Sequence, residues 1–371
     1  MAHIVFAHQV PDAAAEFISV LDLADEDVSV VLTGHEWRSI ALPHAGAKER
    51  LHFLADAATR PATGTWQPDR SGPDDSHWAH SPADWRQEQA RSGLAAAAAV
   101  GAGRIRYSLG HAGHSQFLVS EARPLSVEQL RTKIDVLAGF ASGALPGADA
   151  KRQFLSQAAP SCESFLALTR QQAEHLYYLM YSPDPLVKVP RDPWDFDRSA
   201  YEQERLSATR DWVRAAVPGP AATLVEAGAC EGSLTELLCD AGFRVTATEP
   251  AQDFRERLGS RVAGRAEVTA ATVEDLAGPA PVPADAYLLA EVMYYLDDLA
   301  VVESLPTDLL LVTAPRELLE SVLRPYFEGA GAACWRVESE QELLGARLDF
   351  LVDGLMYQRK RGSVGLTCRR R

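Results

Sequence analysis

The segment from residue 222 to residue 315 alternates short apolar runs with segments of helical pattern. The apolar runs are "ATLVEAG", "RVTATEP", "AEVTAAT", "AYLLAEVM" and "DLLLVTAP", and "SLTELLCDAG" and "AQDFRERLGSRV" are two of the helical segments between them. Strand–helix alternation of this kind predicts a parallel sheet that is covered by helices on both faces. Two extended runs around residues 361–363 predict an antiparallel hairpin at the C-terminal end of this sheet.

The chain has 371 residues, which is more than one ordinary hydrophobic core accommodates, so we expect two domains. Four prolines between residues 183 and 193 indicate a boundary near residue 185, with domains at 1–185 and 186–371. Residues 55–85, which include His77 and His80, are rich in proline, glycine, serine and aspartate and predict a solvated loop. The other elements expected in the first half are strands near 3–7, 28–34 and 104–109 and helices near 85–103, 126–142 and 162–182.

The charge of the chain limits its partners. The formal net charge is −15, whereas a nucleic-acid-binding surface needs a basic face. No apolar run reaches the roughly 18 residues of a membrane-spanning helix, and the N-terminus lacks the pattern of a signal peptide. The five cysteines are scattered without a CxxC pair, which is typical of reduced thiols. We therefore expect a cytoplasmic protein that binds neither nucleic acid nor membrane.

Acidic residues end the first two strands of the second half. Glu226 ends the first strand, Gly228 and Gly232 bracket the turn into the following helix, and Glu249 ends the second strand. In an open parallel sheet the ligand lies beyond the carboxyl ends of the strands, and an acid at the second position accepts the hydroxyls of a ribose. Glu231 and Glu226 would repel a diphosphate at this turn. A nucleoside joined to an amino acid, cationic and free of phosphate, fits better, and S-adenosylmethionine (SAM) is such a molecule.

Residues 190–371 resemble the class I SAM-dependent methyltransferases, and among them the NodS-like N-methyltransferases. The resemblance is carried by "DPWDFDRSAYEQERLSATRDWV", "EAGACEGSLTELL" and "AEVMYYL". It departs from the pattern at Ala229-Cys230, where the turn usually has a middle glycine, and at Thr272, where many relatives carry an acid facing adenine. The residues that the resemblance assigns to the cofactor are Glu226, Gly228, Ala229, Gly232, Glu249, Pro250, Thr272, Val273, Glu291, Trp194 and Tyr201.

Methyl transfer to an amine requires a neutral nitrogen, so a nearby base helps. Glu291 ends the fourth strand at the rim where an acceptor would bind, and we expect it to bind or deprotonate that acceptor; a purely structural carboxylate is the alternative. Tyr294 and Tyr295 are expected to form the pocket wall, with core packing as the alternative. By resemblance, Trp194 and Tyr201 belong to a segment that folds over the cofactor, although ordinary helix packing would also explain them.

The first half resembles the PIG-L-type (LmbE-like) zinc de-N-acetylases at residues 4–12, 28–36 and 85–110. Ala7-His8 matches the start of the family's metal motif, but the Pro-Asp-Asp that should follow is altered, and no late HxxH pair is found at 140–160. Zinc needs three protein ligands in a preset geometry. We therefore expect a non-catalytic domain without zinc, and a rebuilt metal site is the alternative. The candidate ligands are His8, Asp12, His111 and His114.

Together these patterns predict an α/β protein of two domains. A Rossmann-like PIG-L-type domain would precede a class I methyltransferase sheet with an antiparallel C-terminal hairpin. The expected function is SAM-dependent N-methylation of a small-molecule amine, such as an amino sugar or a specialised metabolite. O-methylation of a hydroxylated metabolite, a bifunctional zinc de-N-acetylase/N-methyltransferase and a non-enzymatic SAM-binding protein remain alternatives. The sequence does not identify the acceptor or the oligomeric state, and a homodimer is one option that it leaves open.

Overall fold

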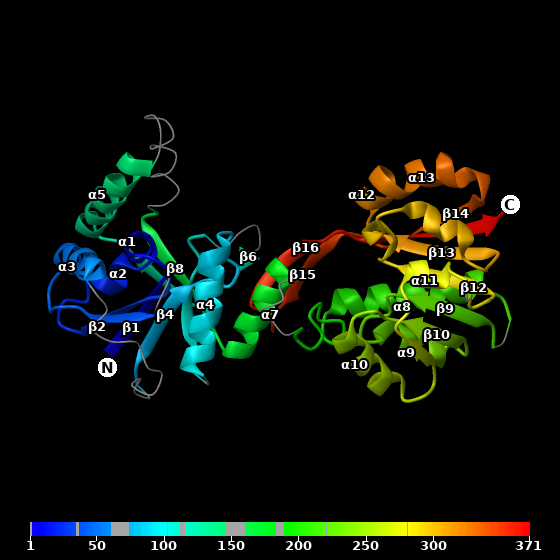
Figure 1. The fold of residues 1–371 in the computed structure, drawn as a ribbon, viewed down its shortest axis with the longest axis horizontal. Coiled ribbons are helices and arrows are strands. Elements are labelled where there is room, and N and C mark those ends of the chain that lie inside the picture. Colours follow the sequence, from blue (N-terminus) through cyan, green and yellow to red (C-terminus); the bar gives the residue numbers. More distant parts are fainter. Residues whose placement is uncertain are drawn as a thin grey trace. The chain divides into compact units, whose positions relative to one another are not determined.

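The chain divides into two compact units, which are described separately (Figure 1). The N-terminal unit comprises Met1–Pro193 with Val352–Tyr357, and the C-terminal unit comprises Trp194–Leu351 with Gln358–Arg371. The division thus falls after Pro193, later than the position near residue 185 expected from the prolines. The computed structural model describes residues 2–34, 37–60, 74–101, 103–111, 116–144, 160–182, 189–219, 221–279 and 281–371.

The C-terminal unit is built on a seven-stranded sheet of order β11-β10-β9-β12-β13-β17-β14. Strands β11 to β13 in this order are parallel to one another, and β17 pairs antiparallel with β13 on one side and with β14 on the other. This arrangement confirms the Rossmann-like α/β sheet with antiparallel strands at its C-terminal end. The strands are β9 (Thr223–Ala227), β10 (Arg244–Thr248), β11 (Glu267–Thr269), β12 (Ala286–Ala290), β13 (Leu309–Ala314), β14 (Trp335–Leu344) and β17 (Ser363–Arg370).

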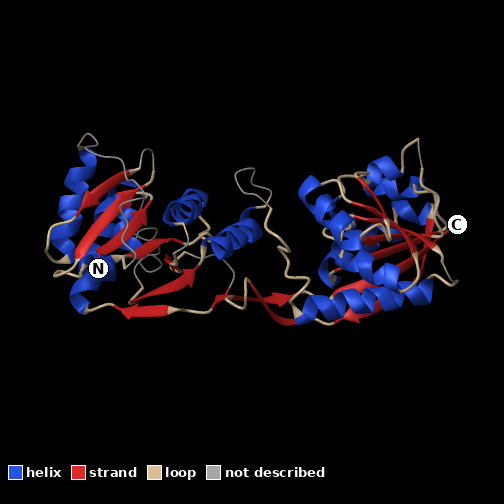
Figure 2. Cartoon of the chain, turned by 90° about the horizontal axis from the view of Figure 1, so that it is seen from below, coloured by secondary structure: helices blue, strands red, loops and turns tan. Residues whose placement is uncertain are grey.

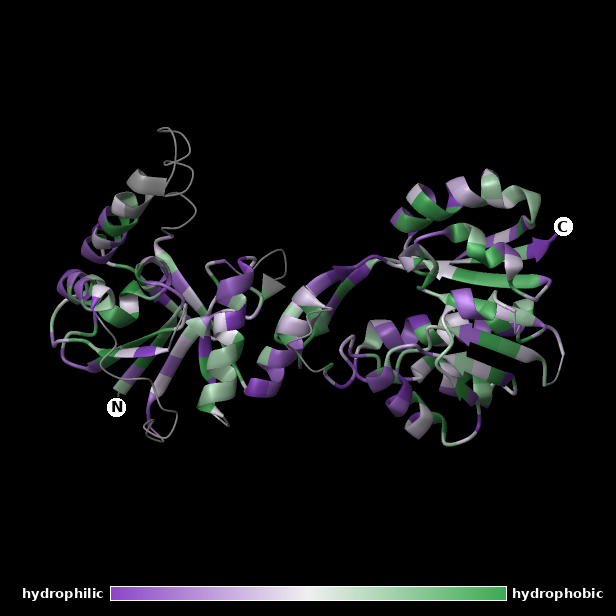
Figure 3. Ribbon diagram, in the orientation of Figure 1, coloured by the Kyte–Doolittle hydropathy of each residue, from purple (hydrophilic) through white to green (hydrophobic). Residues whose placement is uncertain are grey.

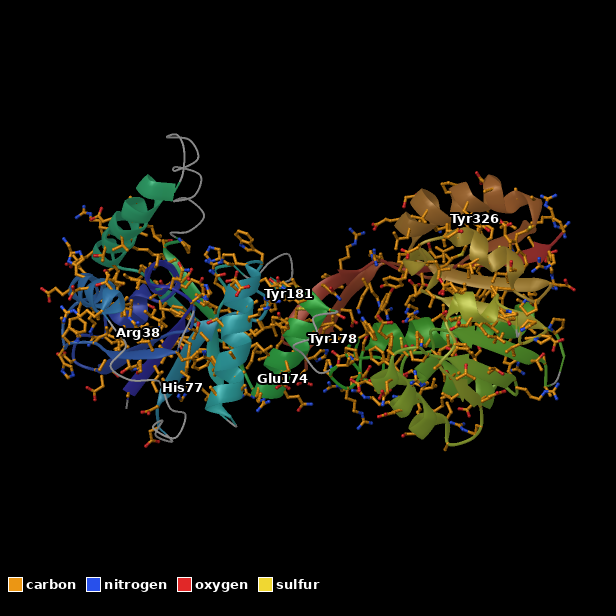
Figure 4. The ribbon with its side chains drawn as sticks, viewed as in Figure 1. Arg38, His77, Glu174, Tyr178, Tyr181 and Tyr326 are labelled. Carbon is orange, nitrogen blue, oxygen red and sulfur yellow. The ribbon has the colours of Figure 1, made fainter. Side chains whose placement is uncertain are left out.

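Helices cover both faces of this sheet (Figures 1 and 2). The strand side chains alternate between two cores because successive residues point to opposite faces: Val225 belongs to one core and Leu224 to the other. Figure 3 shows the central strands as predominantly hydrophobic. One face carries α8 (Ala200–Ala216), α9 (Ser233–Asp240) and α10 (Gln252–Val262). The other face carries α11 (Val273–Leu276), α12 (Arg316–Leu318), a π-helical turn (Leu319–Leu323) and α13 (Arg324–Glu328). Figure 4 labels Tyr326 on α13.

The pairing of the last strand differs from the simple hairpin expected around residues 361–363. Strand β17 pairs with β13 and with β14, so its antiparallel neighbours come earlier in the chain. The strands before it are β15 (Arg347–Leu351) and β16 (Met356–Lys360), and Met356 and Tyr357 of β16 pair antiparallel with β6 (Gln116–Phe117) inside the N-terminal unit. The turn before β17 therefore does not close a hairpin between β16 and β17, and Gly362 adopts a left-handed φ of 80° there.

The N-terminal unit contains a second seven-stranded sheet, of order β3-β2-β1-β4-β5-β8-β7. Among the described residues of the whole chain, no helix combines the length and the apolar character needed to cross a bilayer. The strands are β1 (Ala2–Ala7), β2 (Asp27–Leu32), β3 (Arg38–Ala41), β4 (Ser76–His80), β5 (Ile105–Ser108), β7 (Glu121–Pro124) and β8 (Cys162–Leu168). The helices are α1 (Val10–Glu16), α2 (Ile18–Leu21), α3 (Ala47–Thr59), α4 (Gln87–Val100), α5 (Val127–Ala144) and α7 (Arg170–Tyr181).

Two sequence-based predictions in this unit are wrong. Residues 76–80 are not a solvated loop but strand β4, which lies between β1 and β5 and pairs in parallel with both. His77 and His80 are buried in it, and Figure 4 labels His77. Residues 162–182 are not one helix, because Thr169 caps a new helix with Gln172 after strand β8. Residues 61–73 of the expected loop lie outside the described residues.

Candidate functional site

The turn between β9 and α9 requires left-handed backbone. Gly228 and Gly232 have φ values of 69° and 84°, and Cys230 between them has φ of 48°. A Cβ built on Gly228 would lie 2.6 Å from Val292 Cγ2, and one on Gly232 would lie 2.6 Å from Leu258 Cδ1. The positive φ values disfavour a side chain at both glycines, and Val292 and Leu258 would have to shift to make room for one. Cys230 adopts a conformation that is costly for a residue with a side chain, which is a common feature of ligand sites.

Glu226 lies at the end of β9 and is buried. Its side chain faces α9, where the Thr235 hydroxyl donates a 2.6 Å hydrogen bond to Glu226 Oε2. Burial raises the pKa of Glu226 to about 7, and the bond from Thr235 opposes that rise. This carboxyl is thus close to half ionised at neutral pH, and a neighbouring cation would favour its charged form.

Glu249 follows β10 and is tied to the same turn. Its two carboxylate oxygens accept hydrogen bonds from the backbone N–H groups of Cys230 and Ala251, each at 2.9 Å. Because β9 and β10 are parallel neighbours, Glu226 and Glu249 come to the same edge of the sheet. Burial raises the pKa of Glu249, and the two backbone bonds oppose that rise. Each oxygen keeps a lone pair for a further donor.

Two other residues of the turn have clear structural roles. Ala229 is buried and belongs to the core beneath α8 and α9. Glu231 is also buried, and its Oε1 accepts a 2.5 Å hydrogen bond from Arg257 Nη1, so the negative charge that we expected to repel phosphate is compensated. Pro250 is exposed beside Glu249. The two carboxylates that remain available to a ligand at this turn are therefore those of Glu226 and Glu249.

Thr272 and Val273 lie at the start of α11. The Thr272 hydroxyl accepts a hydrogen bond from the backbone N–H of Asp275, and the Asp275 carboxylate accepts one from the Thr272 backbone. Val273 is buried in the core on that face of the sheet. Helix capping and packing thus account for both side chains, which leaves adenine contact by them as a prediction.

Glu291 follows β12 and has a positive φ of 59°. Its backbone N–H donates a hydrogen bond to Thr313 Oγ1 at 3.2 Å. Its carboxylate accepts hydrogen bonds from Tyr294 Oη at 2.8 Å and from Ser363 Oγ at 3.1 Å. Ser363 is 1% exposed and was not identified from the sequence, since it lies far along the chain on β17. A strained backbone combined with two donors to one carboxylate indicates a side chain that the fold orients.

The two tyrosines after Glu291 differ in environment. Burial and the neighbouring Glu291 carboxylate raise the pKa of Tyr294, which therefore remains a protonated hydrogen-bond donor. Tyr295 is 78% exposed, and its ring centroid lies 4.7 Å from that of Tyr294. Tyr294 contacts Glu291, whereas Tyr295 is exposed, and a pocket-wall role for the two rings stays a prediction.

The aromatic residues before β9 pack around the same edge of the sheet. The Trp194 ring lies 5.4 Å from that of Phe254, on the helix that follows Glu249, and 5.7 Å from that of Phe196. Tyr201 is buried, and Lys360 Nζ lies 5.8 Å from its ring centroid. These contacts place both predicted aromatic residues within the C-terminal unit, near the elements that carry the site.

Two of the four predicted metal ligands of the N-terminal unit, Asp12 and His111, belong to a cluster of acids and histidines. Glu16, which the sequence analysis missed, lies at its centre: Glu16 Oε2 is 3.1 Å from His80 Nδ1, and Oε1 is 3.3 Å from His111 Nδ1. Ligand atoms of Asp12, Glu16 and His80 all lie within 4.8 Å of one another. Glu16 is four residues after Asp12, a spacing that puts both on one face of α1.

The guanidinium group of Arg86 contacts the three carboxylates of this cluster. Arg86 donates to Asp12 Oδ1 at 3.1 Å, to Asp84 Oδ2 at 2.7 Å and to Glu16. Although burial opposes ionisation, the nearby His80 and His111 side chains and the charge of Arg86 hold the pKa of Glu16 well below its usual value. His8 contributes only its backbone N–H, to His80 Nε2, and His114 lies outside the described residues.

Comparison with known proteins gives matches to the C-terminal half. Residues 187–319 match the model of the family described as nodulation protein S (NodS). Nodulation protein S of Bradyrhizobium diazoefficiens is 30% identical over 128 residues, which are 34% of this chain and 60% of that protein. The chain thus covers less than two thirds of the length of this relative.

Solved methyltransferase structures are also similar to this chain. The N-methyltransferase NodS of Bradyrhizobium japonicum WM9, in complex with S-adenosyl-L-homocysteine, has 18% identity and a TM-score of 0.38 over 49% of this chain and 93% of its own. The magnesium protoporphyrin IX methyltransferase of Synechocystis PCC 6803, with bound SAM, has 14% identity and a TM-score of 0.37 over 50% of this chain and 86% of its own.

Proposed function

We propose that the C-terminal unit is a SAM-dependent methyltransferase that methylates an amine of a small molecule. The observation that carries this proposal is the meeting of Glu226 and Glu249 at a glycine turn whose sequence is not the G-x-G-x-x-G of a diphosphate site. The family match over residues 187–319 supports the same activity.

The proposed cofactor fits the charges at the turn. Glu249 is held by two backbone bonds and has lone pairs directed away from them, so it can accept both hydroxyls of a ribose. Glu226 lies in a poorly solvated position where a cation stabilises its ionised form. A nucleoside with an ammonium and a sulfonium group supplies both kinds of partner, which a nucleotide diphosphate does not.

Glu291 is the proposed acceptor-binding group. Transfer from a sulfonium is an in-line displacement, in which alignment of the reactants lowers the barrier by about 7–11 kcal/mol. The attacking amine must be neutral, and a carboxylate held by Tyr294 and Ser363 can accept its proton or its N–H hydrogen bond. The same carboxylate would also serve a hydroxyl acceptor, so the similarity to NodS is what favours an amine.

The cofactor part of the proposal is tested by calorimetric titration with SAM and with S-adenosylhomocysteine. We expect Glu249→Ala to weaken the binding of both roughly 10- to 100-fold, because it removes charge-assisted hydrogen bonds to the ribose. Glu256→Ala, an exposed acid on α10, is the matched control and should bind normally. Absence of binding by the natural chain, or unchanged binding by Glu249→Ala, would refute the cofactor assignment.

The transfer step is tested with methyl-labelled SAM, a panel of primary amines that includes amino sugars, and the corresponding hydroxyl compounds. We expect label in the amines, and a rate about 100-fold lower in Glu291→Gln with unchanged SAM affinity. Asp297→Asn, an exposed acid in the same loop, should retain full activity. Label found only in the hydroxyl compounds would refute the proposed N-methylation and indicate an O-methyltransferase.

For the N-terminal unit we propose a non-catalytic role without resident zinc. Arg86 already supplies positive charge to Asp12, Glu16 and Asp84, which supports an ion-pair cluster in place of a metal centre. Metal analysis of the purified protein should then find less than about a tenth of an equivalent of zinc, and a chelator should leave its thermal unfolding unchanged. Stoichiometric zinc that is lost together with de-N-acetylase activity would favour the bifunctional alternative.

A further inference from the structure

The turn that leads into β17 brings Arg361 to the rim of the proposed acceptor site. Arg361 lies two residues before Ser363, whose hydroxyl donates a 3.1 Å hydrogen bond to Glu291 Oε1. Two residues of extended chain span at most about 7 Å, so the two Cα atoms are no farther apart than the length of an arginine side chain. Tyr294 is the second donor to Glu291. Burial and the Glu291 carboxylate raise the pKa of Tyr294, and the positive charge of Arg361 opposes that rise.

The backbone of this turn is held in one position. Gly362 has a left-handed φ of 80°, and a Cβ built on it would lie 2.9 Å from Leu344 O and 3.1 Å from Ala346 N. The turn therefore packs directly against the backbone between β14 and β15, and Ser363 on its other side is 1% exposed. Arg361 itself is exposed. Its Cα is thus fixed by its neighbours, whereas its side chain is accessible to a ligand.

Arg361 has no partner of its own in the part of the chain that the structure describes. Its guanidinium group forms no hydrogen bond or ion pair there, although the chain carries 51 acidic against 36 basic residues. Other arginines of the C-terminal unit are paired with carboxylates, such as Arg257 with Glu231 and Arg324 with Glu340. In a chain with this excess of acids, an arginine that pairs with none of them keeps its donors for a ligand.

Glu291 and Arg361 thus provide an acid and a cation on one rim, and the two do not pair with each other. The Glu291 carboxylate is oriented by Tyr294 and Ser363, and its remaining lone pairs can accept the N–H of an amine. The guanidinium group of Arg361 presents a planar set of donors, which binds a carboxylate or a phosphate through two parallel hydrogen bonds. The rim therefore matches a molecule with both an amine and an anionic group, whereas a neutral amine would use only half of it.

We propose that the acceptor is an acidic amine: Glu291 binds the amine that receives the methyl group, and Arg361 binds a carboxylate or a phosphate of the same molecule. This inference rests on the proposed function and deepens it, because it names the class of substrate for that site. The anionic group takes no part in the transfer, so the product is an N-methylated acid. Binding at two points also fixes the orientation of the acceptor, which the in-line displacement requires.

The inference is tested with the full chain, SAM that carries a deuterated methyl group, and a deproteinised metabolite extract of the organism that encodes the chain. Mass spectrometry identifies each labelled product by its formula. One portion of the extract is treated with phosphatase, which removes phosphates, and another is methyl-esterified, which masks carboxylates. We expect an acid-bearing product and at least a tenfold loss of its labelling after one of the two treatments, which distinguishes a phosphate from a carboxylate.

Variants of Arg361 show whether this residue recognises the anion. Arg361→Gln should raise KM for the acid-bearing acceptor roughly 10- to 100-fold, while kcat and the dissociation constant of S-adenosylhomocysteine change less than about threefold. Arg361→Lys keeps the charge and should recover part of the loss, whereas Arg361→Glu should increase it. Arg214→Gln, which alters an exposed arginine of α8, is the matched control and should behave as the natural chain does.

The outcomes separate this inference from the proposed function. If no amine of the extract is labelled, the proposed methyltransferase function is wrong and the inference falls with it. If the labelled amine bears no acid, or if neither treatment lowers its labelling, the anion site is refuted and the function stands. An unchanged KM in Arg361→Gln refutes the role of Arg361, and so does a parallel loss of S-adenosylhomocysteine affinity in a folded variant. Should Arg361→Gln not fold, the KM of Arg361→Lys makes the same test.

Discussion

At the scale of single residues, we expect the protonation of the Glu226 carboxyl to be coupled to the binding of the cofactor. Burial raises the pKa of this carboxyl to about 7 in the folded protein, so it is largely protonated below that pH. A bound cation favours the ionised form, and the proton must therefore be released when the cofactor binds at acidic pH. In the unfolded chain this carboxyl ionises at about pH 4.5, whereas in the folded protein it ionises at about pH 7. The free energy of unfolding of the cofactor-free protein should therefore fall as the pH rises between these two values.

The affinity for SAM should consequently rise about tenfold per pH unit between pH 5.5 and 6.5 and level off above about pH 7.5. Calorimetry in buffers of different ionisation enthalpy would measure the released proton directly. Glu226→Gln should bind more weakly and lose this pH dependence. A pH-independent affinity in the natural chain would show that Glu226 does not face the cation.

Ser363 is a positioning residue for Glu291. It donates a 3.1 Å hydrogen bond to Glu291 Oε1 from a different strand. We expect Ser363→Ala to lower kcat/KM for the acceptor about 3- to 30-fold, because the carboxylate loses one of its two orienting donors. The dissociation constant of S-adenosylhomocysteine should not change. Ser363→Thr keeps the hydroxyl and should restore most of the activity, which a merely structural role would not predict.

At the scale of elements, the turn between β9 and α9 depends on the conformation of Gly232. A side chain there is disfavoured by the φ of 84° and by the 2.6 Å approach to Leu258. Gly232→Ala should lower the free energy of unfolding of the C-terminal unit by about 1–2 kcal/mol. Gly259→Ala, within α10 and with open space around its Cβ, is the control and should raise it by up to about 1 kcal/mol. Denaturant unfolding measures the change in free energy for both variants. If Gly232→Ala and Gly259→Ala changed stability equally, the left-handed conformation of Gly232 would not be what the turn depends on.

At the scale of the whole molecule, the two units have separate hydrophobic cores. Calorimetric unfolding of the full chain should therefore show two transitions, one for each unit. S-adenosylhomocysteine should raise the midpoint temperature of the C-terminal transition only. Arg86→Met should lower the free energy of unfolding of the N-terminal unit by about 3–5 kcal/mol, because Asp12, Glu16 and Asp84 lose their shared cation. The exposed pair of Arg91 with Glu88 provides the control, and Arg91→Met should change stability by less than about 0.5 kcal/mol. A single transition, shifted by both ligand and mutation, would contradict this description.

The sequence by itself determined the parallel core of the C-terminal sheet and the acids at the ends of β9 and β10. Both depend on patterns within a few tens of residues: apolar strands, helices with a polar face, and glycines at a turn. It did not identify β4, because the histidines and the tryptophan in "SHWAH" hide the apolar alternation of a buried strand. It also did not separate β8 from α7, because that boundary depends on the cap at Thr169.

Only the tertiary structure decided which distant side chains meet. Ser363 reaches Glu291 because β17 returns antiparallel beside β13, and Lys360 reaches Glu202 from the strand before it. In the N-terminal unit, Arg86 meets Glu16 because α1 and the start of α4 converge at the end of β4. Strand pairing and buried ion pairs of this kind depend on long-range packing, whose register no local pattern specifies.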